Sequence, residues 1–250
     1  MNLISAASLT PSSIYCVGKN YQLHAEEMLQ WESQNEAIKK TAEKPEEPII
    51  FLKPSSSLSF DGTTSIPLFQ GKPISQNMHY EAELVVLIGR DADNVFAHDA
   101  LSFVAGYGVG LDMTLRDVQM SAKEKGEPWL KCKGFRNSSL VSDFVPAEHI
   151  LNSDKLAFEL SLNGTIVQKG TAEKMLFDIA SLISYLSYIY GLRAGDLLFT
   201  GTPEGVGQVK NGDRLHAELS LEESKGKTLL TELDAVIEPE QKSIIHLKRS

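Results

Sequence analysis

Cysteine is scarce in this chain: its 250 residues include only two, Cys16 and Cys132. They are far apart and lack metal-ligand spacing, which argues against a disulfide framework or a zinc site and fits a reducing cytosol. Long apolar runs are also missing, and residues 1–10 lack the positively charged start of a secretion signal. We therefore expect a soluble, cytoplasmic protein that does not enter a membrane.

Positive charge is in deficit. Lys and Arg number 24 against 33 Asp and Glu, a formal net charge of −9, and no basic run stands out. This balance argues against a nucleic-acid-binding surface. An anionic substrate would need local positive charge, from a metal ion and a few Lys or Arg side chains. Repeats and a convincing linker are also lacking, so we expect one structural unit, with an N-terminal arm and lid-like helix over residues 1–60 and a catalytic domain over 61–250.

Two acidic residues precede the most apolar stretch of the chain. Glu81 and Glu83 lead into the run 84–89, which is typical of a strand. Because strand side chains alternate between faces, His79, Glu81 and Glu83 would share one face. Neighbouring buried carboxylates need a compensating charge, and oxygen ligands favour Mg, Ca or Mn over Zn. The alternative at this point is a half-exposed edge strand with two solvated Glu side chains.

A third carboxylate, Asp112, ends the Gly-punctuated apolar run 106–112. Glycine within a strand often marks close approach by another backbone or by a ligand. An acid at the end of such a run suits an oxygen-rich metal site, although Asp112 could instead cap the next helix.

Several motifs follow one another in a fixed order. The first is Glu81-x-Glu83, and the second is 110-GLDMT-114 with Arg116, Asp117 and Gln119. Then come Pro128-Trp129, Lys133-x-Phe135 and Thr200-Gly201-Thr202-Pro203-x-Gly205-Val206-Gly207. Together they resemble the fumarylacetoacetate hydrolase family from about Ile14 to about Leu215. The match is to its small single-domain branch, which includes acylpyruvases, fumarylpyruvate hydrolases and related decarboxylases.

The resemblance implies a fold and a site. The fold would be α+β, a mixed β-sandwich roll with few helices, usually found as a homodimer. Mg²⁺ or Mn²⁺ would be held by Glu81, Glu83 and Asp112. His24 and Glu27 would orient and deprotonate a water molecule, with Lys133 as the active-site lysine. The implied contacts to a small 2-oxo acid substrate are Lys19, Tyr21, Arg116, Gln119 and Thr202. Lys19 stands where the family commonly has Arg, so bidentate geometry is lost there.

Spacing alone favours interpretations in which some of these residues have no role in a functional site. His24 and Glu27 are three apart, as in a solvated pair on a surface helix. Arg116 could pair with Asp117 or Glu124 on the surface. A helical pattern starts near Gln22. The polar segment 29–48 would continue this helix and then form a loop, either a lid over the substrate or a solvated insertion without a role.

Local patterns also predict particular elements. The run 49–53 would be a buried strand, and Thr114-x-x-Asp117 a capping box for a helix ending near Gly126. Asn163-Gly164 would join a β-hairpin. A helix would span 176–190, with Asp178 near its start and Gly191 just past its end.

Because both His24 and Glu27 are present, the sequence favours metal-dependent hydrolysis of a carbon–carbon bond in an acylpyruvate, with release of pyruvate. The alternative is a decarboxylase or tautomerase that acts on oxaloacetate-like or aromatic-catabolism 2-oxo diacids, since the same electron sink serves it without attack by water. A third possibility is a metal-binding scaffold without catalysis.

Overall fold

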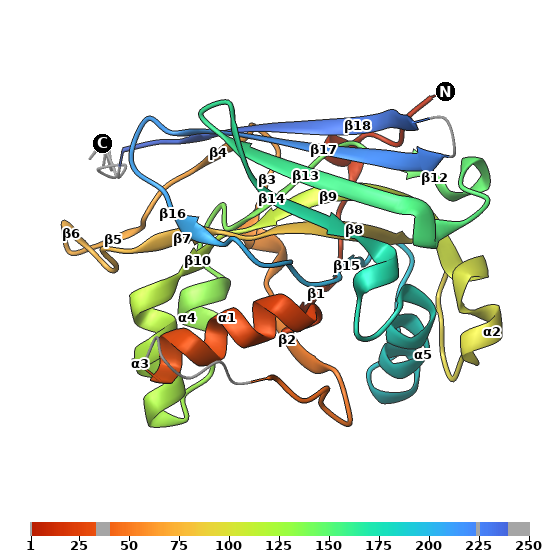
Figure 1. The fold of residues 1–250 in the computed structure, drawn as a ribbon, viewed down its shortest axis with the longest axis horizontal. Helices are drawn as coiled ribbons and strands as arrows, with labels where there is room; N and C mark the ends of the chain where they lie inside the picture. The colour runs from red at the N-terminus through yellow and green to blue at the C-terminus, as the bar shows by residue number, and fades with distance from the viewer. Residues whose placement is uncertain (1, 34–40, 224–225, 240–250) are drawn as a thin grey trace, which may run out of the picture.

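The computed structural model describes residues 2–33, 41–223 and 226–239. Two β-sheets lie one above the other, and helices cover the outer face of the larger sheet (Figure 1). The α-helices are α1 (Gln22–Ser33), α2 (Ala97–Ala100), α3 (Arg116–Lys125), α4 (Leu130–Lys133) and α5 (Ile179–Ile189). Short 3-10 helices are Ala6–Ser8, Ser55–Ser57, Leu101–Phe103, Ala147–His149, Ser153–Lys155 and Ala172–Lys174.

The larger sheet has eight strands in the order β2-β1-β15-β8-β9-β11-β3, with β12 also pairing with β9. Its strands are β1 (Ile14–Gly18), β2 (Ile49–Lys53), β3 (Leu58–Ser59), β8 (Ala82–Ile88), β9 (Val104–Asp112), β11 (Ser139–Val141), β12 (Val145–Pro146) and β15 (Leu197–Phe199). Residues from the N-terminal quarter of the chain thus complete the sheet that holds Glu83.

The second layer is a five-stranded sheet in the order β14-β13-β17-β18-β4. Its strands are β4 (Thr63–Thr64), β13 (Leu156–Leu162), β14 (Thr165–Thr171), β17 (Arg214–Glu223) and β18 (Gly226–Ile237). Two smaller sheets join β10 (Thr114–Leu115), β7 (Met78–Tyr80) and β16 (Gly207–Gln208), and β5 (Leu68–Phe69) with β6 (Lys72–Pro73). This mixture of sheets with few helices confirms the expected α+β fold.

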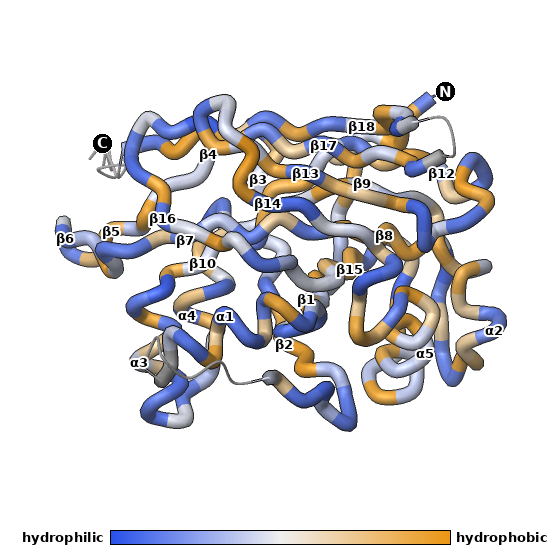
Figure 2. Tube along the Cα trace, viewed as in Figure 1, coloured by the Kyte–Doolittle hydropathy of each residue, from blue (hydrophilic) through white to orange (hydrophobic). Residues whose placement is uncertain are grey.

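Strand β8 is buried along its whole length. Leu84 and Val86 point into the core between the two sheets, whereas Val85 and Leu87 join a second apolar cluster on the other face. Figure 2 shows apolar colour along β8 and α5 and polar colour in the outer loops. Burial on both faces explains why this strand is a nearly continuous apolar run.

Turn and cap signals in the sequence are confirmed. Asn163 and Gly164, both with positive φ (51° and 83°), join β13 to β14 as a hairpin. Asp178 accepts a hydrogen bond from Ser181 N at 2.7 Å and so caps α5. Gly191, with φ 68°, follows the end of that helix.

Two local predictions are wrong. The run 49–53 is an edge strand rather than a buried one: Ile49 and Leu52 are exposed, and Lys53 is the buried member. The capping box is also absent. Thr114 lies in β10 and pairs with His79 of β7, and α3 begins at Arg116 without a side-chain cap. The helix does end at Gly126, which has φ 68°.

The polar segment 29–48 is helical as far as Ser33, as predicted. Residues 34–40 lie outside the described residues, so the lid remains a prediction. Among the described residues, no helix is long and apolar enough to span a membrane.

Candidate active site

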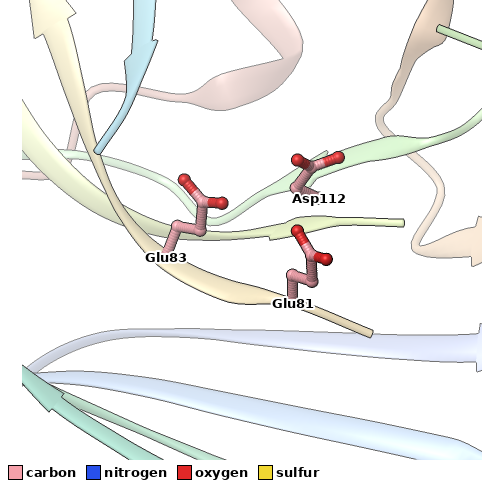
Figure 3. A group of neighbouring side chains, drawn as sticks. All are labelled: Glu81, Glu83 and Asp112. Atoms are coloured by element: carbon pink, nitrogen blue, oxygen red, sulfur yellow. The ribbon is translucent and has the colours of Figure 1, made fainter. Parts of the chain in front are cut away.

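Glu81, Glu83 and Asp112 converge in the interior, as the sequence predicted. One oxygen from each carboxylate lies within 4.8 Å of the others, and the residues are 4%, 1% and 0% exposed. Figure 3 shows the three carboxylates gathered beside β8 and β9. The register of these strands explains the meeting, because Asp112 N donates to Glu81 O at 2.8 Å. The alternative of two solvated Glu side chains is therefore wrong.

The sequence predicts one strand from His79 through the run 84–89, but the strand is interrupted at Glu81, which lies between β7 and β8. His79 therefore belongs to the three-stranded sheet. Its ring hydrogen-bonds Asn77 at 2.8 Å and meets Trp31 edge-on, so His79 is not in the carboxylate cluster.

Three buried cations surround the carboxylates. Lys133 Nζ donates to Glu81 Oε2 at 2.5 Å and to Asp112 Oδ2 at 2.7 Å. Arg116 Nη2 donates to Glu81 Oε1. Lys53 Nζ lies 2.7 Å from Asp112 Oδ1, an ion pair without hydrogen-bond geometry, and donates instead to Ser138 O and Oγ. Sequence reasoning missed Lys53, whose only signal is a lysine at the end of an apolar strand.

Burial and charge separate the carboxyl groups. Burial alone would raise the pKa of Glu81, but Lys133 and Arg116 outweigh it and hold the pKa below the usual range. For Glu83, burial together with Asp112 and Glu81 raises the pKa well above the usual value. Gly201 N donates to Glu83 at 2.6 Å, and within the described parts of the chain no Lys, Arg or His forms an ion pair with it. Glu83 is thus the carboxylate that most needs a further positive charge.

Arg116 and Gln119 lie together at the start of α3. Arg116 Nη1 donates to Gln119 Oε1 at 2.5 Å, which confirms that the two share a helix face. The alternative of a surface pairing with Asp117 or Glu124 is wrong, because Arg116 is buried, and Asp117 accepts from Ser75 Oγ and Gln76 N instead. Arg116 Nε is buried and is one of the few polar atoms in the described residues without a hydrogen-bond partner.

His24 and Glu27 form a pair on α1, with His24 Nδ1 3.2 Å from Glu27 Oε2. Gly205 N donates to Glu27 Oε1 at 3.2 Å, because α1 lies beside the loop between β15 and β16 (Figure 1). His24 is only 5% exposed. The interpretation as a solvated surface pair is therefore wrong.

Thr202 directly follows Gly201 in the loop between β15 and β16. Its Oγ1 accepts from Gln168 Nε2 at 2.9 Å, and Gln168 also donates to Pro203 O and accepts from Ala82 N, each at 2.9 Å. Gln168 thereby ties the loop to the start of β8. Sequence reasoning missed it, because a glutamine on a hairpin strand carries no signal of burial.

Gly201 is one position where the backbone requires glycine. Its φ is 101°, and a Cβ there would lie 2.7 Å from the Asn20 Cβ. This conformation lets its N–H reach Glu83.

A cavity of about 30 Å³, hereafter the inner cavity, opens above the cluster. Its lining includes most of the predicted site residues: Lys19, His24, Glu81, Glu83, Arg116, Gln119, Lys133 and Thr202. Tyr21 lies elsewhere. Its hydroxyl donates to Thr171 O at 3.2 Å, and its ring packs edge-on against Phe158 in the core, which corrects the expected contact with substrate.

The comparisons decide the family. The model of the "Fumarylacetoacetate (FAA) hydrolase C-terminal" family matches residues 13–235. The chain belongs to this family.

Among curated relatives, oxaloacetate tautomerase FAHD1, mitochondrial, of Bos taurus is 41% identical over 206 residues, covering 82% of this chain and 86% of the relative. Oxaloacetate tautomerase YcgM of Escherichia coli (strain K12) is 40% identical, with the same coverage. Among solved structures, fumarylpyruvate hydrolase from Pseudomonas aeruginosa in complex with Mn²⁺ and pyruvate has a TM-score of 0.78 and 32% identity, covering 95% of each chain. These likenesses support the tautomerase alternative better than the carbon–carbon hydrolysis that the sequence favoured.

Proposed function

We propose that this protein is a divalent-metal-dependent tautomerase of oxaloacetate-like 2-oxo diacids that interconverts their enol and keto forms. The observation that carries the proposal is the buried cluster of Glu81, Glu83 and Asp112 beside Lys133 and Arg116. It occurs in a chain about 40% identical to proteins named as oxaloacetate tautomerases.

The donor set fits a hard divalent cation. All three side chains offer carboxylate oxygens, the ligands that Mg²⁺ and Mn²⁺ prefer, and they are close enough to share one ion. Glu83 has a raised pKa and no ion-pair partner among the described residues, so a bound cation would stabilise its charged form. The fumarylpyruvate hydrolase neighbour is described with Mn²⁺ bound. When bound, the metal would supply Lewis-acid polarisation of a 2-oxo group.

Arg116, Gln119 and Thr202 supply donors for the substrate carboxylate. Within the described part of the chain, Arg116 Nε–H is buried and has no hydrogen-bond partner. The Gln119 amide N–H groups can be donated to a substrate, because its Oε1 already accepts from Arg116. Thr202 Oγ1 accepts from Gln168, so the Thr202 hydroxyl hydrogen can be donated to another group. All three side chains line the inner cavity. A 2-oxo acid held by them would place its reacting carbons next to Lys133.

His24 and Glu27 move the proton. His24 directs Nδ1 to Glu27, which leaves Nε2 as the ring atom able to exchange a proton with a substrate in the inner cavity. Enol-to-keto conversion removes the proton from the enol oxygen and adds one at C3, so no atoms are gained and no water is consumed. The positive charge of Lys133, held between Glu81 and Asp112, stabilises negative charge that develops on the 2-oxo oxygen.

The test follows the loss of ultraviolet absorbance as enol oxaloacetate becomes the keto form, with Mg²⁺ or Mn²⁺ present. We expect Glu27→Gln to lower the catalysed rate by about 100-fold, within the range of general acid–base catalysis. Glu26→Gln is the matched control, because Glu26 on the same helix bonds Gln22 instead. Equal rates for wild type and Glu27→Gln would contradict the assigned role.

Product analysis separates the competing activities. Coupled detection of pyruvate reports decarboxylation of oxaloacetate or hydrolysis of acetylpyruvate, whereas tautomerisation releases none. Fast ketonisation with little pyruvate is the expected result. Fast pyruvate release from acetylpyruvate without ketonisation of oxaloacetate would restore the hydrolase interpretation, and metal binding without either activity would indicate a scaffold.

A further inference from the structure

Gln168 joins the two layers of the molecule at the site. It lies in β14 of the five-stranded sheet and is 2% exposed. Its side chain reaches the loop between β15 and β16 and the start of β8, which belongs to the eight-stranded sheet (Figure 1). The loop approaches β14 so closely that a Cβ on Gly205 would lie 2.4 Å from Val167 O. One side chain of the second layer therefore contacts both segments that build the site.

Two backbone groups fix the direction of the Gln168 amide. The Ala82 N–H can only donate, and it bonds Gln168 Oε1 at 2.9 Å. The Pro203 carbonyl can only accept, and it bonds Gln168 Nε2 at 2.9 Å. Because Oε1 and Nε2 are the two ends of one amide, both backbone groups require the same orientation.

The fixed amide in turn fixes the Thr202 hydroxyl. Gln168 Nε2 carries two hydrogens, of which one goes to Pro203 O and the other to Thr202 Oγ1 at 2.9 Å. Thr202 Oγ1 therefore accepts from this side, and its own hydrogen must be directed elsewhere. Thr202 also lines the inner cavity. A carboxylate bound there can only accept, so the hydroxyl is set as a donor before the substrate arrives.

The same contacts place this donor relative to the carboxylate cluster. Gly201 N donates to Glu83 Oε2 at 2.6 Å, and Gln168 joins the next loop residue, Thr202, to Ala82. Ala82 lies between two members of the cluster, Glu81 and Glu83. The loop is thus attached to β8 at two consecutive residues, and the second attachment passes through the Gln168 side chain.

We propose that Gln168 is a positioning residue, which sets the Thr202 hydroxyl as a hydrogen-bond donor to the substrate carboxylate. This inference rests on the proposed function, in which Thr202 contacts that carboxylate. Of the described residues that line the inner cavity, Thr202 is one and Gln168 is not, so Gln168 acts through Thr202. A donor that is oriented in advance needs no reorganisation when the substrate binds. It strengthens binding of the 2-oxo acid, whereas the proton is moved by His24 and Glu27.

The test replaces Gln168 by Glu, which has the same shape. One oxygen of the introduced carboxylate can still accept from Ala82 N–H. The other oxygen takes the place of Nε2 and can only accept once it is ionised, so it draws the Thr202 hydroxyl hydrogen away from the substrate. We expect Gln168→Glu to raise KM for oxaloacetate by about tenfold or more, the effect of losing one hydrogen bond to a charged group. The value of kcat should change by less than about threefold, because the lost contact binds ground state and transition state alike.

A pH profile separates this effect from general damage to the fold. Buried carboxyl groups ionise as late as about pH 8–9, so KM is measured at about pH 7 and about pH 9. Protonated, the introduced carboxyl carries one donor again. The loss in Gln168→Glu relative to wild type should therefore grow as the pH rises.

A cycle with Thr202→Val tests whether Gln168 acts through Thr202. Thr202→Val removes the hydroxyl and should itself raise KM, and Gln168→Glu should then add less than about twofold. Gln208→Glu is the control, because Gln208 is an exposed residue just after the loop that donates to Gln76 O, and its KM should stay within about twofold of wild type. If circular dichroism shows that Gln168→Glu does not fold, Gln168→Met replaces it. This variant leaves the hydroxyl unheld and should raise KM by about threefold or more, again without further effect beside Thr202→Val.

Calorimetric binding of pyruvate in the presence of Mg²⁺ separates the inference from the proposed function. If wild type ketonises oxaloacetate, then a fall in kcat alone, a loss in Gln168→Glu that does not change with pH, or losses that multiply in the double variant overturn the inference and leave the function intact. If wild type does not ketonise oxaloacetate, the proposed function fails. Pyruvate binding that weakens at position 168 only when the Thr202 hydroxyl is present then still supports the inference. Equal binding by wild type and Gln168→Glu, or binding by neither, overturns it.

Discussion

Replacement of Lys53 by Met tests the electrostatic account of the site most severely. Lys53 is 1% exposed, and its ammonium lies 2.7 Å from Asp112 Oδ1, 2.8 Å from Ser138 O and 2.9 Å from Ser138 Oγ. Met has a similar length and no charge, so Lys53→Met removes the cation without opening a large cavity. Among the described residues, Asp112, itself 0% exposed, would then keep Lys133 alone as a contacting cation.

The expected loss is large. Breaking one side of a buried ion pair costs about 3–5 kcal/mol, because the remaining charge stays buried. The total free energy of unfolding of a domain is only about 5–15 kcal/mol. We therefore expect Lys53→Met to lower the free energy of unfolding by about 3–5 kcal/mol, enough to unfold a marginal variant.

Urea unfolding followed by circular dichroism, with EDTA throughout, measures this loss. A cycle with Asp112→Asn isolates the pair: the double variant should lose less than the sum of the two single variants by about 1 kcal/mol or more. Lys155→Met is the control, because Lys155 forms an exposed pair with Glu173 at 3.7 Å and should change stability by less than about 1 kcal/mol. A loss below about 1 kcal/mol for Lys53→Met, or strict additivity in the cycle, would refute the reasoning.

Three further predictions concern groups outside the carboxylate cluster. Gln168→Leu should lower the free energy of unfolding by about 2–4 kcal/mol, since it strands the buried Ala82 N–H and Pro203 carbonyl; an unchanged urea midpoint would contradict this. Burial raises the pKa of both cysteine thiols, that of Cys132 to about 11. Ellman's reagent should therefore label neither cysteine in the native protein and both in urea. Fast labelling of the native protein would contradict this prediction. A hydrogen bond with Asp234 raises the pKa of His216, so the stability that His216 contributes is present below the unfolded-state pKa and is lost as pH rises through the folded-state pKa. An NMR titration should place the His216 pKa above the ordinary histidine value. A pKa at or below that value would contradict the prediction.

The carboxylate cluster was accessible from the sequence because its information is local. Alternation along a strand put Glu81 and Glu83 on one side, and the Gly-rich run ended in Asp112. The family motifs then supplied the pairing of strands that no single segment encodes. The interruption at Glu81, which assigns His79 to another sheet, is not visible in the alternating pattern, because the pattern continues unchanged through it.

Lys53 and Gln168 were inaccessible because long-range packing alone gives them their roles. Gln168 bonds Ala82, 86 residues away in the chain, and nothing near it in sequence shows that it is 2% exposed. Tertiary pairing likewise overrode a local signal at Thr114, whose strand contact with His79 replaced the predicted helix cap. Spacing indicated a surface pair at His24 and Glu27, but His24 is 5% exposed and Glu27 accepts a hydrogen bond from Gly205 N in the 200–207 loop.

The most direct test of the central claim is the ketonisation rate of enol oxaloacetate in wild type, Glu83→Gln and the exposed-site control Glu232→Gln, each with Mg²⁺, Mn²⁺ or EDTA, together with calorimetric binding of Mn²⁺. We predict metal-dependent acceleration and Mn²⁺ binding in wild type and the control, with both lost in Glu83→Gln and the acceleration lost in EDTA. Full activity of wild type in EDTA, or of Glu83→Gln with metal, would contradict the account.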